Sequence, residues 1–194
     1  MRARKSSEEL GVRSEEVVIR ERRKLSLRSA RELGLPDEHI HFLDFTDGAI
    51  ADRPQPETER LQRLIADIAP TAIFVPHSGE GWPDHLAARE IILNLQHCHD
   101  CHNRESRKQK FSTIIYEYAV WMWYYNVWRL DWRNAFRFRM SKSELSAKRQ
   151  AVDAYVKPLA PNGKPWSGVL PRPFLYANTR PLELYFRHED IDRS

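Results

Sequence analysis

The segment IFVPHSGEGWPDH, residues 73–85, joins the pattern of a buried strand to a run of chemically active side chains. Its first four residues are an apolar run, which is typical of a strand buried inside a parallel sheet. A Gly-rich bend follows, with groups that can bind a metal or move a proton: His77, Glu80, Asp84 and His85. Because open α/β sheets bind ligands at the carboxyl ends of their strands, this segment predicts a functional site.

The sequence before this segment alternates helical and strand patterns. Ser14, followed by two acidic residues, starts a predicted helix that ends near Leu33, with Gly34 as its C-terminal cap. Residues 40–45 predict a strand, and residues 46–48 predict the turn that ends it.

A second helix and strand follow, and a third helix lies beyond the site. Apolar residues at helical spacing predict an amphipathic helix that stops at Pro70; they are Leu61, Leu64, Ile65 and Ile68. Residues 72–75 form the buried strand, and residues 86–95 repeat the helical pattern. The order helix, strand, helix, strand, helix predicts an α/β fold with a parallel sheet.

The second half of the chain has a different character. Residues 116–140 are rich in aromatics, and residues 136–140 alternate as a half-exposed strand does. Residues 141–144 form a capping box that opens a helix ending before Pro158. The Pro-rich tail from Pro161 onward is expected to wrap the surface. We expect one domain over residues 1–194, with residues 1–13 flexible.

Composition limits the function classes. The 194 residues carry a net charge of +4, and residues 1–32 account for all of it with ten Lys/Arg against six Asp/Glu. A nucleic-acid-binding protein normally has a larger and more clustered positive surface, so no nucleic-acid partner is expected. The sequence shows neither the ~20 apolar residues of a membrane span nor a signal peptide, which predicts a cytoplasmic protein.

The Asp84-His85 pair has two interpretations. A catalytic zinc ion usually has three protein ligands and one open position, and this pair can supply one or two of them. Alternatively, Asp84 caps the following helix and His85 only begins it. Glu117, an acid between Tyr116 and Tyr118, belongs either to a buried hydrogen bond or to the site.

Two further patterns have simpler explanations. Residues 98–102, CHDCH, match the spacing of c-type haem attachment and, with His97, resemble a metal cluster. Haem attachment requires export, and such a segment is more often a polar loop. Adventitious metal binding is favoured over either of these interpretations. Residues 128–140 interleave aromatics with arginines, as base-stacking surfaces do. A two-faced segment with aromatics inward and arginines outward is favoured over that reading.

Taken in order, the motifs resemble the PIG-L/LmbE-like zinc-dependent de-N-acetylases. The resemblance rests on a helix ending in Leu-Gly, a strand with an Asp-Gly turn, a strand followed by a Pro-Asp-His motif, and three later segments. These lie at residues 30–34, 41–48, 70–85, 116–121, 148–155 and 180–183. The resemblance implies a Rossmann-like α/β domain that hydrolyses the acetamide of an N-acetylated amino sugar with zinc-activated water. The substrate is a small molecule, glycan or glycolipid, and an oligomer is possible.

The resemblance also implies roles for individual residues. His85 is the zinc ligand, and Asp84 orients the neighbouring motif histidine, whose position is occupied here by Trp82. His77 is the candidate to replace that histidine as a catalytic group. Glu80, Trp82 and Glu117 are the candidates for contact with substrate.

One motif of the family is not found. Its Ala-His-Pro-Asp-Asp-Glu segment, which supplies two zinc ligands and the general base, does not occur in this sequence. We therefore expect an N-terminally incomplete fold, poor solubility and little deacetylase activity. The alternative function is an inactive or truncated family member that binds a sugar or phosphate.

Overall fold

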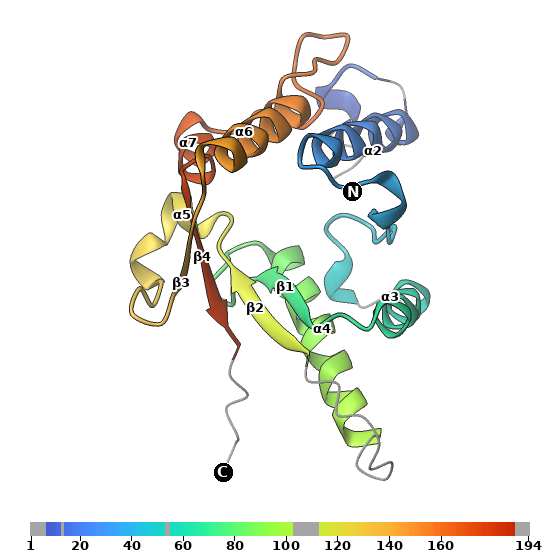
Figure 1. Cartoon of the computed structure of the whole chain (residues 1–194). Helices are drawn as coiled ribbons and strands as arrows, with labels where there is room; N and C mark the ends of the chain where they lie inside the picture. The colour runs from blue at the N-terminus through green and yellow to red at the C-terminus, as the bar shows by residue number, and fades with distance from the viewer. Residues whose placement is uncertain (1–6, 13, 53–54, 103–112, 189–194) are drawn as a thin grey trace. The chain divides into compact units, whose positions relative to one another are not determined.

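The computed structural model describes residues 7–12, 14–52, 55–102 and 113–188. The chain forms two compact units (Figure 1). Unit 1 comprises Met1–Phe42 and Arg139–Glu183, and unit 2 comprises Leu43–Phe138 and Leu184–Ser194. Each unit is therefore assembled from two separate parts of the sequence.

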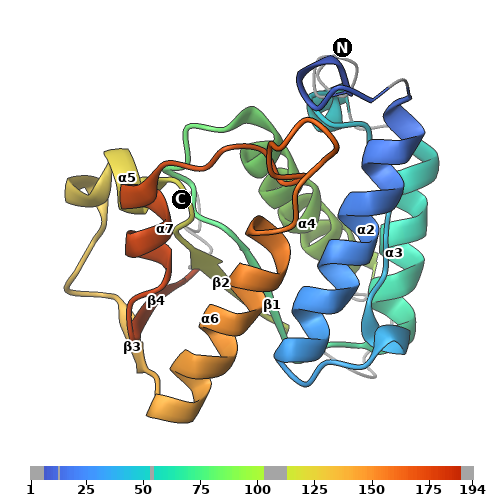
Figure 2. The same ribbon diagram turned by 90° about the horizontal axis from the view of Figure 1, so that it is seen from above.

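Unit 1 is built around two helices that pack against each other, α2 (Glu15–Glu32) and α6 (Lys142–Val156) (Figure 2). It also contains the short 3-10 helix η1 (Asp37–His39) and helix α7 (Arg172–Asn178). Part of its core is a cluster of Leu10, Val18 and Ala160, with Val12 and Trp166 packed against it.

The ends of these helices follow the sequence signals. Ser14 caps α2 by accepting a hydrogen bond from the Glu16 N–H at 3.1 Å. Gly34, at a φ of 77°, ends it, because the N–H groups of Gly34 and Leu35 return to carbonyls in the last turn. A capping box at Ser141 opens α6 as predicted.

Unit 2 holds most of the strands. Its elements are η2 (Ile50–Asp52), α3 (Gln55–Ile68), β1 (Ala72–Pro76), α4 (Pro83–His102), β2 (Ile114–Tyr118), α5 (Met122–Tyr125), η3 (Val127–Arg129), and most of β3 (Phe136–Arg139) and β4 (Leu182–Arg187). The predicted helices at residues 61–68 and 86–95 and the strand at residues 72–75 are thus confirmed. No helix in the described ranges is long and apolar enough to cross a membrane.

The four strands form one sheet in the order β1-β2-β4-β3. β1 and β2 pair in parallel, with Phe74 opposite Tyr116. β2 and β4 pair antiparallel, with Glu117 opposite Phe186. The α/β class is confirmed, but the sheet is mixed rather than fully parallel. The departure arises from the tail, because residues 182–187 alternate buried and accessible positions and so add a strand beside β2.

The strand predicted at residues 40–45 does not form. These residues adopt no regular secondary structure, and Asp44 has a left-handed φ of 64° that interrupts an extended run. The turn predicted after them does form, with Gly48 at a φ of 81°. The tail was expected only to wrap the surface, but it contributes α7 and β4 as well.

The sheet has two unlike faces. Helix α4 packs against β1 and buries Val75, Ile115 and Leu93 (Figure 1). The opposite face carries a row of aromatic rings in mutual contact, in which Phe74 stacks on Tyr116 at 5.4 Å between ring centroids. Tyr185 and Phe136 continue the row by edge-to-face contacts at 5.2 and 5.8 Å.

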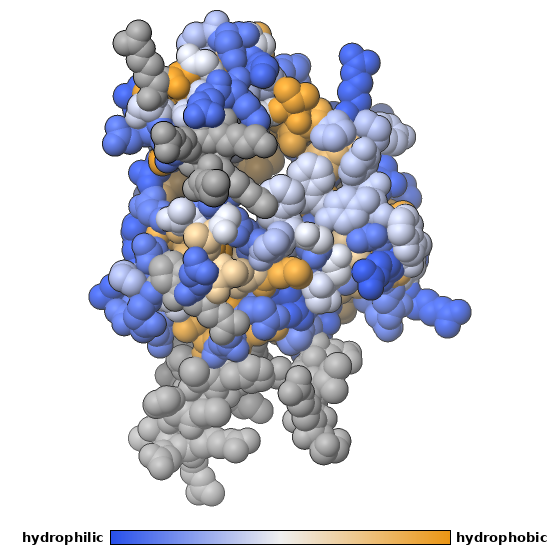
Figure 3. All heavy atoms as spheres, turned by 180° about the vertical axis from the view of Figure 1, so that it is seen from behind, coloured by the Kyte–Doolittle hydropathy of each residue, from blue (hydrophilic) through white to orange (hydrophobic). Residues whose placement is uncertain are grey.

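This aromatic row remains accessible. Phe74 is 53% exposed and Phe136 is 54% exposed. Large apolar side chains are also exposed elsewhere, and one face of the chain shows apolar patches between hydrophilic residues (Figure 3).

Candidate functional site

The loop at residues 77–82 is fixed by backbone hydrogen bonds at the carboxyl end of β1. The His77 N–H donates to the Tyr118 carbonyl at 2.9 Å, which extends the pairing of β1 with β2. The Glu80 N–H then donates to the His77 carbonyl at 3.0 Å and closes a turn. The Gly81 N–H donates to the Tyr125 hydroxyl at 3.0 Å, so the loop also contacts α5.

The two glycines of this loop are required by space. A Cβ atom on Gly79 would lie 2.6 Å from the Met122 Cε, and one on Gly81 would lie 2.8 Å from the Tyr125 hydroxyl. Real Cβ contacts are longer than this, so any side chain here would displace the loop or its neighbours. The bend that the sequence pattern indicated therefore packs closely against α5.

Glu80 lies at the centre of this packing and is buried. Its carboxylate accepts hydrogen bonds from the N–H groups of Val120, Trp121 and Met122 at 2.7, 3.1 and 3.2 Å. Its Oε2 also lies 3.2 Å from the His85 Nδ1. Burial alone would raise the pKa of Glu80, but the hydrogen bonds from His85 and the backbone together lower that pKa, which favours the carboxylate.

His85 lies in the first turn of α4 and is partly exposed, with 27% of its side chain accessible. Its contact with Glu80 gives it a carboxylate partner at one ring nitrogen. A histidine held in this way can serve as a metal ligand or as a base through its other nitrogen.

Asp84 binds a different loop. It is buried, and its Oδ2 accepts a hydrogen bond from the Gly48 N–H at 2.6 Å. Asp84 thereby fixes the turn at residues 46–48 beside the N-terminus of α4. The turn and the helix, predicted separately from the sequence, are brought together by this contact.

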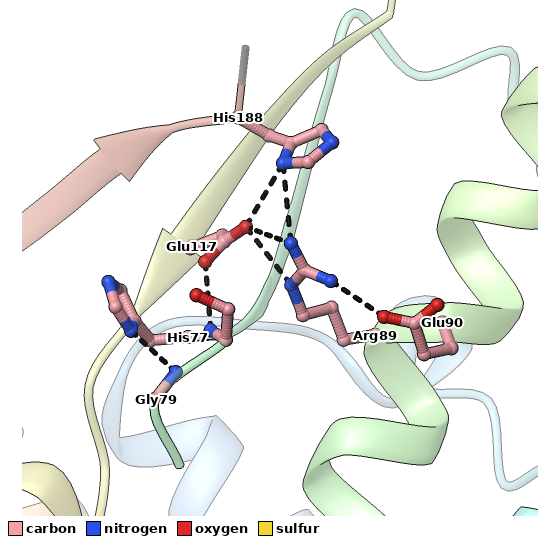
Figure 4. Close-up of polar contacts among 7 residues, drawn as sticks. His77, Gly79, Arg89, Glu90, Glu117 and His188 are labelled. Atoms are coloured by element: carbon pink, nitrogen blue, oxygen red, sulfur yellow. Dashed lines mark hydrogen bonds and ion pairs between the residues drawn. The ribbon is translucent and has the colours of Figure 1, made fainter. Parts of the chain in front are cut away.

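Glu117 forms a buried ion-pair cluster beside the loop (Figure 4). One oxygen, Oε1, lies 2.7 Å from Arg89 Nη2 and 3.1 Å from His188 Nδ1. The other oxygen, Oε2, accepts a hydrogen bond from the Ser78 N–H at 2.9 Å. Burial acts to raise the pKa of Glu117, but the bonds from Arg89 and Ser78 outweigh it and lower that pKa.

His77 has one ring nitrogen engaged within the loop. Its Nδ1 accepts a hydrogen bond from the Gly79 N–H at 2.9 Å, as Figure 4 shows, so the proton of the neutral ring lies on Nε2. The ring packs edge-to-face on Phe186 at 4.9 Å. Burial lowers the pKa of His77 despite the opposing charge of Glu117, which favours the neutral imidazole.

Trp82 lies directly before α4 and is 38% exposed. Its ring stacks on Trp121, with centroids 6.1 Å apart and planes at 18°. Because the Trp121 N–H also bonds to Glu80, the stacked pair lies close to the Glu80–His85 contact. The pair forms a flat aromatic surface at the edge of the candidate site.

A catalytic zinc ion needs about three protein ligands. Within the described ranges, no group of three His, Cys, Asp or Glu residues is placed to hold a metal ion. His85 alone does not make such a site, and Asp84 is engaged with Gly48. The described residues therefore do not fit a catalytic zinc ion. The CHDCH segment at residues 98–102 ends α4, but its side chains lie outside the described part of the structure.

Several partners in this region were not predicted from the sequence. Arg89 lies inside a helical pattern, where an arginine normally indicates a solvent-facing position. His188 lies in the tail, and its approach depends on β4 pairing with β2. The amides of residues 120–122 carry no side-chain signal at all. The isolated acid at Glu117, within an apolar run, indicated either a buried hydrogen bond or a place in the site, but it did not identify a partner.

Comparison with known families gives one match. Residues 2–96 match the model of the PIG-L family, which is described as GlcNAc-PI de-N-acetylase. The matched range includes β1, the loop at residues 77–82, and the first turns of α4 with Asp84 and His85. Neither the curated proteins nor the solved structures contain a significant match. The resemblance inferred from the motifs is confirmed over these residues.

Proposed function

Because residues 2–96 match the PIG-L family model, we propose that the chain is a de-N-acetylase of an N-acetylated amino sugar. The observation that carries the proposal is the position of His85, held by a buried carboxylate at the end of β1 within the matched range. Hydrolysis of an acetamide requires a base for the attacking water, a donor for the oxyanion and a proton for the leaving amine.

His85 and His77 suit two of these tasks. The accessible side chain of His85 offers a ring nitrogen that can accept a proton or bind a ligand. The neutral His77 offers an Nε2–H, which suits hydrogen bonding to an oxyanion better than protonation of an amine. Asp84 positions the turn at residues 46–48 rather than reacting. No step is assigned to zinc, since the described residues do not provide its ligand set.

The test is release of free amine from an N-acetylglucosaminyl substrate. N-acetylglucosaminyl-phosphatidylinositol and N-acetylglucosamine would be incubated with the full chain, with and without added zinc, and amine measured by fluorescence labelling. We expect release that falls at least tenfold in His85→Ala and is unchanged in His39→Ala, an exposed histidine of unit 1. Equal rates in the chain and a no-protein blank would overturn the proposal.

A second candidate is a binding module for the same sugars without hydrolysis. Two observations favour it: the described residues hold no three-ligand metal group, and Trp82, which stacks on Trp121, is exposed at the site. Aromatic faces commonly pack against the apolar face of a ring-shaped ligand. Calorimetric binding of N-acetylglucosamine without amine release, weakened by Trp82→Ala, is the result expected for this candidate.

A further inference from the structure

The carboxylate of Glu80 uses all of its hydrogen-bonding capacity. Its Oε1 accepts from the N–H groups of Val120 and Met122, and its Oε2 accepts from the N–H of Trp121. The remaining position on Oε2 faces the His85 Nδ1 at 3.2 Å. An ionised carboxylate offers about four acceptor sites, so none is left for any other ligand.

This arrangement determines where the shared proton lies. Backbone N–H groups can only donate, so three of the four partners require Glu80 to be an acceptor. Hydrogen bonds from three donors stabilise the charged carboxylate more than its protonated form, because hydrogen bonds to an ionised acceptor are the stronger ones. The proton between Glu80 and His85 therefore lies on the imidazole, at Nδ1.

We propose that Glu80 is the positioning residue for His85: it holds the neutral imidazole in the Nδ1–H tautomer and so presents a bare Nε2 lone pair to the site. In water a histidine ring is free to rotate and to exchange tautomers. Here the partner is buried and cannot follow the ring, because three successive amides hold its carboxylate. The ring is thereby fixed in both orientation and protonation pattern.

The chemical meaning of this tautomer rests on the proposed function. The tautomer itself does not depend on whether the chain is active. A bare Nε2 is the atom that a histidine uses as a base or as a ligand. The tautomer can be measured without any substrate, so a failure of the proposed function and a failure of this inference give different results.

The experiment is long-range proton–nitrogen NMR on the full chain with ¹⁵N-labelled histidines, at about pH 8, above the ~6.5 reference pKa of histidine. His85 is assigned by the signals lost in His85→Gln. We expect the wild type to show a protonated Nδ1 and a bare Nε2. In Glu80→Gln we expect the Nε2–H tautomer to appear or the two forms to average. A wild type with Nε2–H at His85 overturns the inference.

Two matched variants separate positioning from general packing. Glu117→Gln alters the other buried carboxylate beside the loop and should change the signals of His188 but not those of His85. Glu80→Asp retains the charge on a shorter side chain and should partly restore the Nδ1–H tautomer. A folded Glu80→Gln with an unchanged His85 tautomer would overturn the inference, and where that variant does not fold, the wild-type spectrum alone decides.

Discussion

At the scale of single residues, the ion pair of Glu117 and Arg89 is buried beside the candidate site. Their side chains are only 7% and 12% exposed, and Arg89 Nη2 lies 2.7 Å from the carboxylate. Removing one partner of such a pair leaves an uncompensated charge in the interior, which is strongly unfavourable. The pair therefore offers a direct test of the packing around the loop.

We expect Glu117→Ala to lower the free energy of unfolding by about 3–5 kcal/mol, because Arg89 then remains buried without its main partner. Urea unfolding followed by tryptophan fluorescence measures the change. The double variant Glu117→Leu/Arg89→Met should recover much of the loss, since both charges are removed together. Asp153→Ala, in an exposed pair with Lys157, is the control and should leave the midpoint almost unchanged.

His77 predicts a dependence of stability on pH. Burial lowers the pKa of His77 in the folded chain below its ordinary value of 6.5, so the unfolded chain takes up a proton first as the pH falls. The contribution of neutral His77 to the free energy of unfolding is therefore complete above pH 6.5 and declines as the pH falls below 6.5. The pKa values of Glu80 and Glu117 are lowered from 4.5, so their contributions are lost only at more acidic pH.

The measurement is the free energy of unfolding at about pH 7.5 and about pH 5.5, on either side of the ordinary histidine value. The loss of stability between these two conditions should be smaller in His77→Gln than in the wild type. Equal losses in the two proteins would mean that His77 is as easily protonated in the folded chain as in the unfolded one.

Sequence reasoning was effective for residues whose neighbours are close in the chain. Glu80 and His85 are five positions apart, so a local pattern places both at the end of β1. Their actual contact could not be inferred, because it depends on how the loop turns around Gly79 and Gly81. His188 lies 71 positions from Glu117 in the sequence, and no local pattern connects them.

At the scale of helices and strands, the capping signals were the most reliable predictors. The N-termini of α2 and α6 fall at Ser14 and Ser141, because a hydroxyl that accepts a backbone N–H is a local requirement. The prediction of a strand at residues 40–45 was wrong, because strand formation, unlike helix capping, is not decided locally. An apolar pattern becomes a strand only when another strand pairs with it, and that partner is not encoded locally.

The capping box of α6 can be tested directly. Ser141→Ala should lower the free energy of unfolding by about 1 kcal/mol, because the N–H of Glu144 loses its acceptor. Thermal unfolding followed by circular dichroism measures the effect. Ser146→Ala, an exposed serine in the interior of the same helix, should be neutral or slightly stabilising. Similar losses in both variants would show that the cap contributes nothing specific.

At the scale of the whole molecule, the most consequential feature is the aromatic face of the sheet. Accessible apolar surface of this kind favours association with other proteins or with further copies of the chain. The sequence showed the density of aromatics but not their side of the sheet, because that depends on the register of β1, β2 and β4. The mixed sheet could not be predicted, because it depends on the pairing of β4 with β2, which lie far apart in the sequence.

We expect the chain to self-associate through this face. In sedimentation velocity the average sedimentation coefficient should rise with concentration, and Phe74→Thr/Phe136→Thr should reduce that rise while preserving the strands. Tyr176→Thr, an exposed but separate aromatic residue of unit 1, is the control and should not alter it. A concentration-independent wild type would contradict the prediction.

The close packing of the loop at residues 77–82 also limits how this site can change by mutation. Gly79 and Gly81 have no room for a side chain, and Glu80 is held on every side. Ser78 and Trp82, by contrast, direct accessible side chains outward from the same loop. Variation in ligand preference among natural or selected variants should therefore accumulate at these two positions, while the three residues between them stay constant.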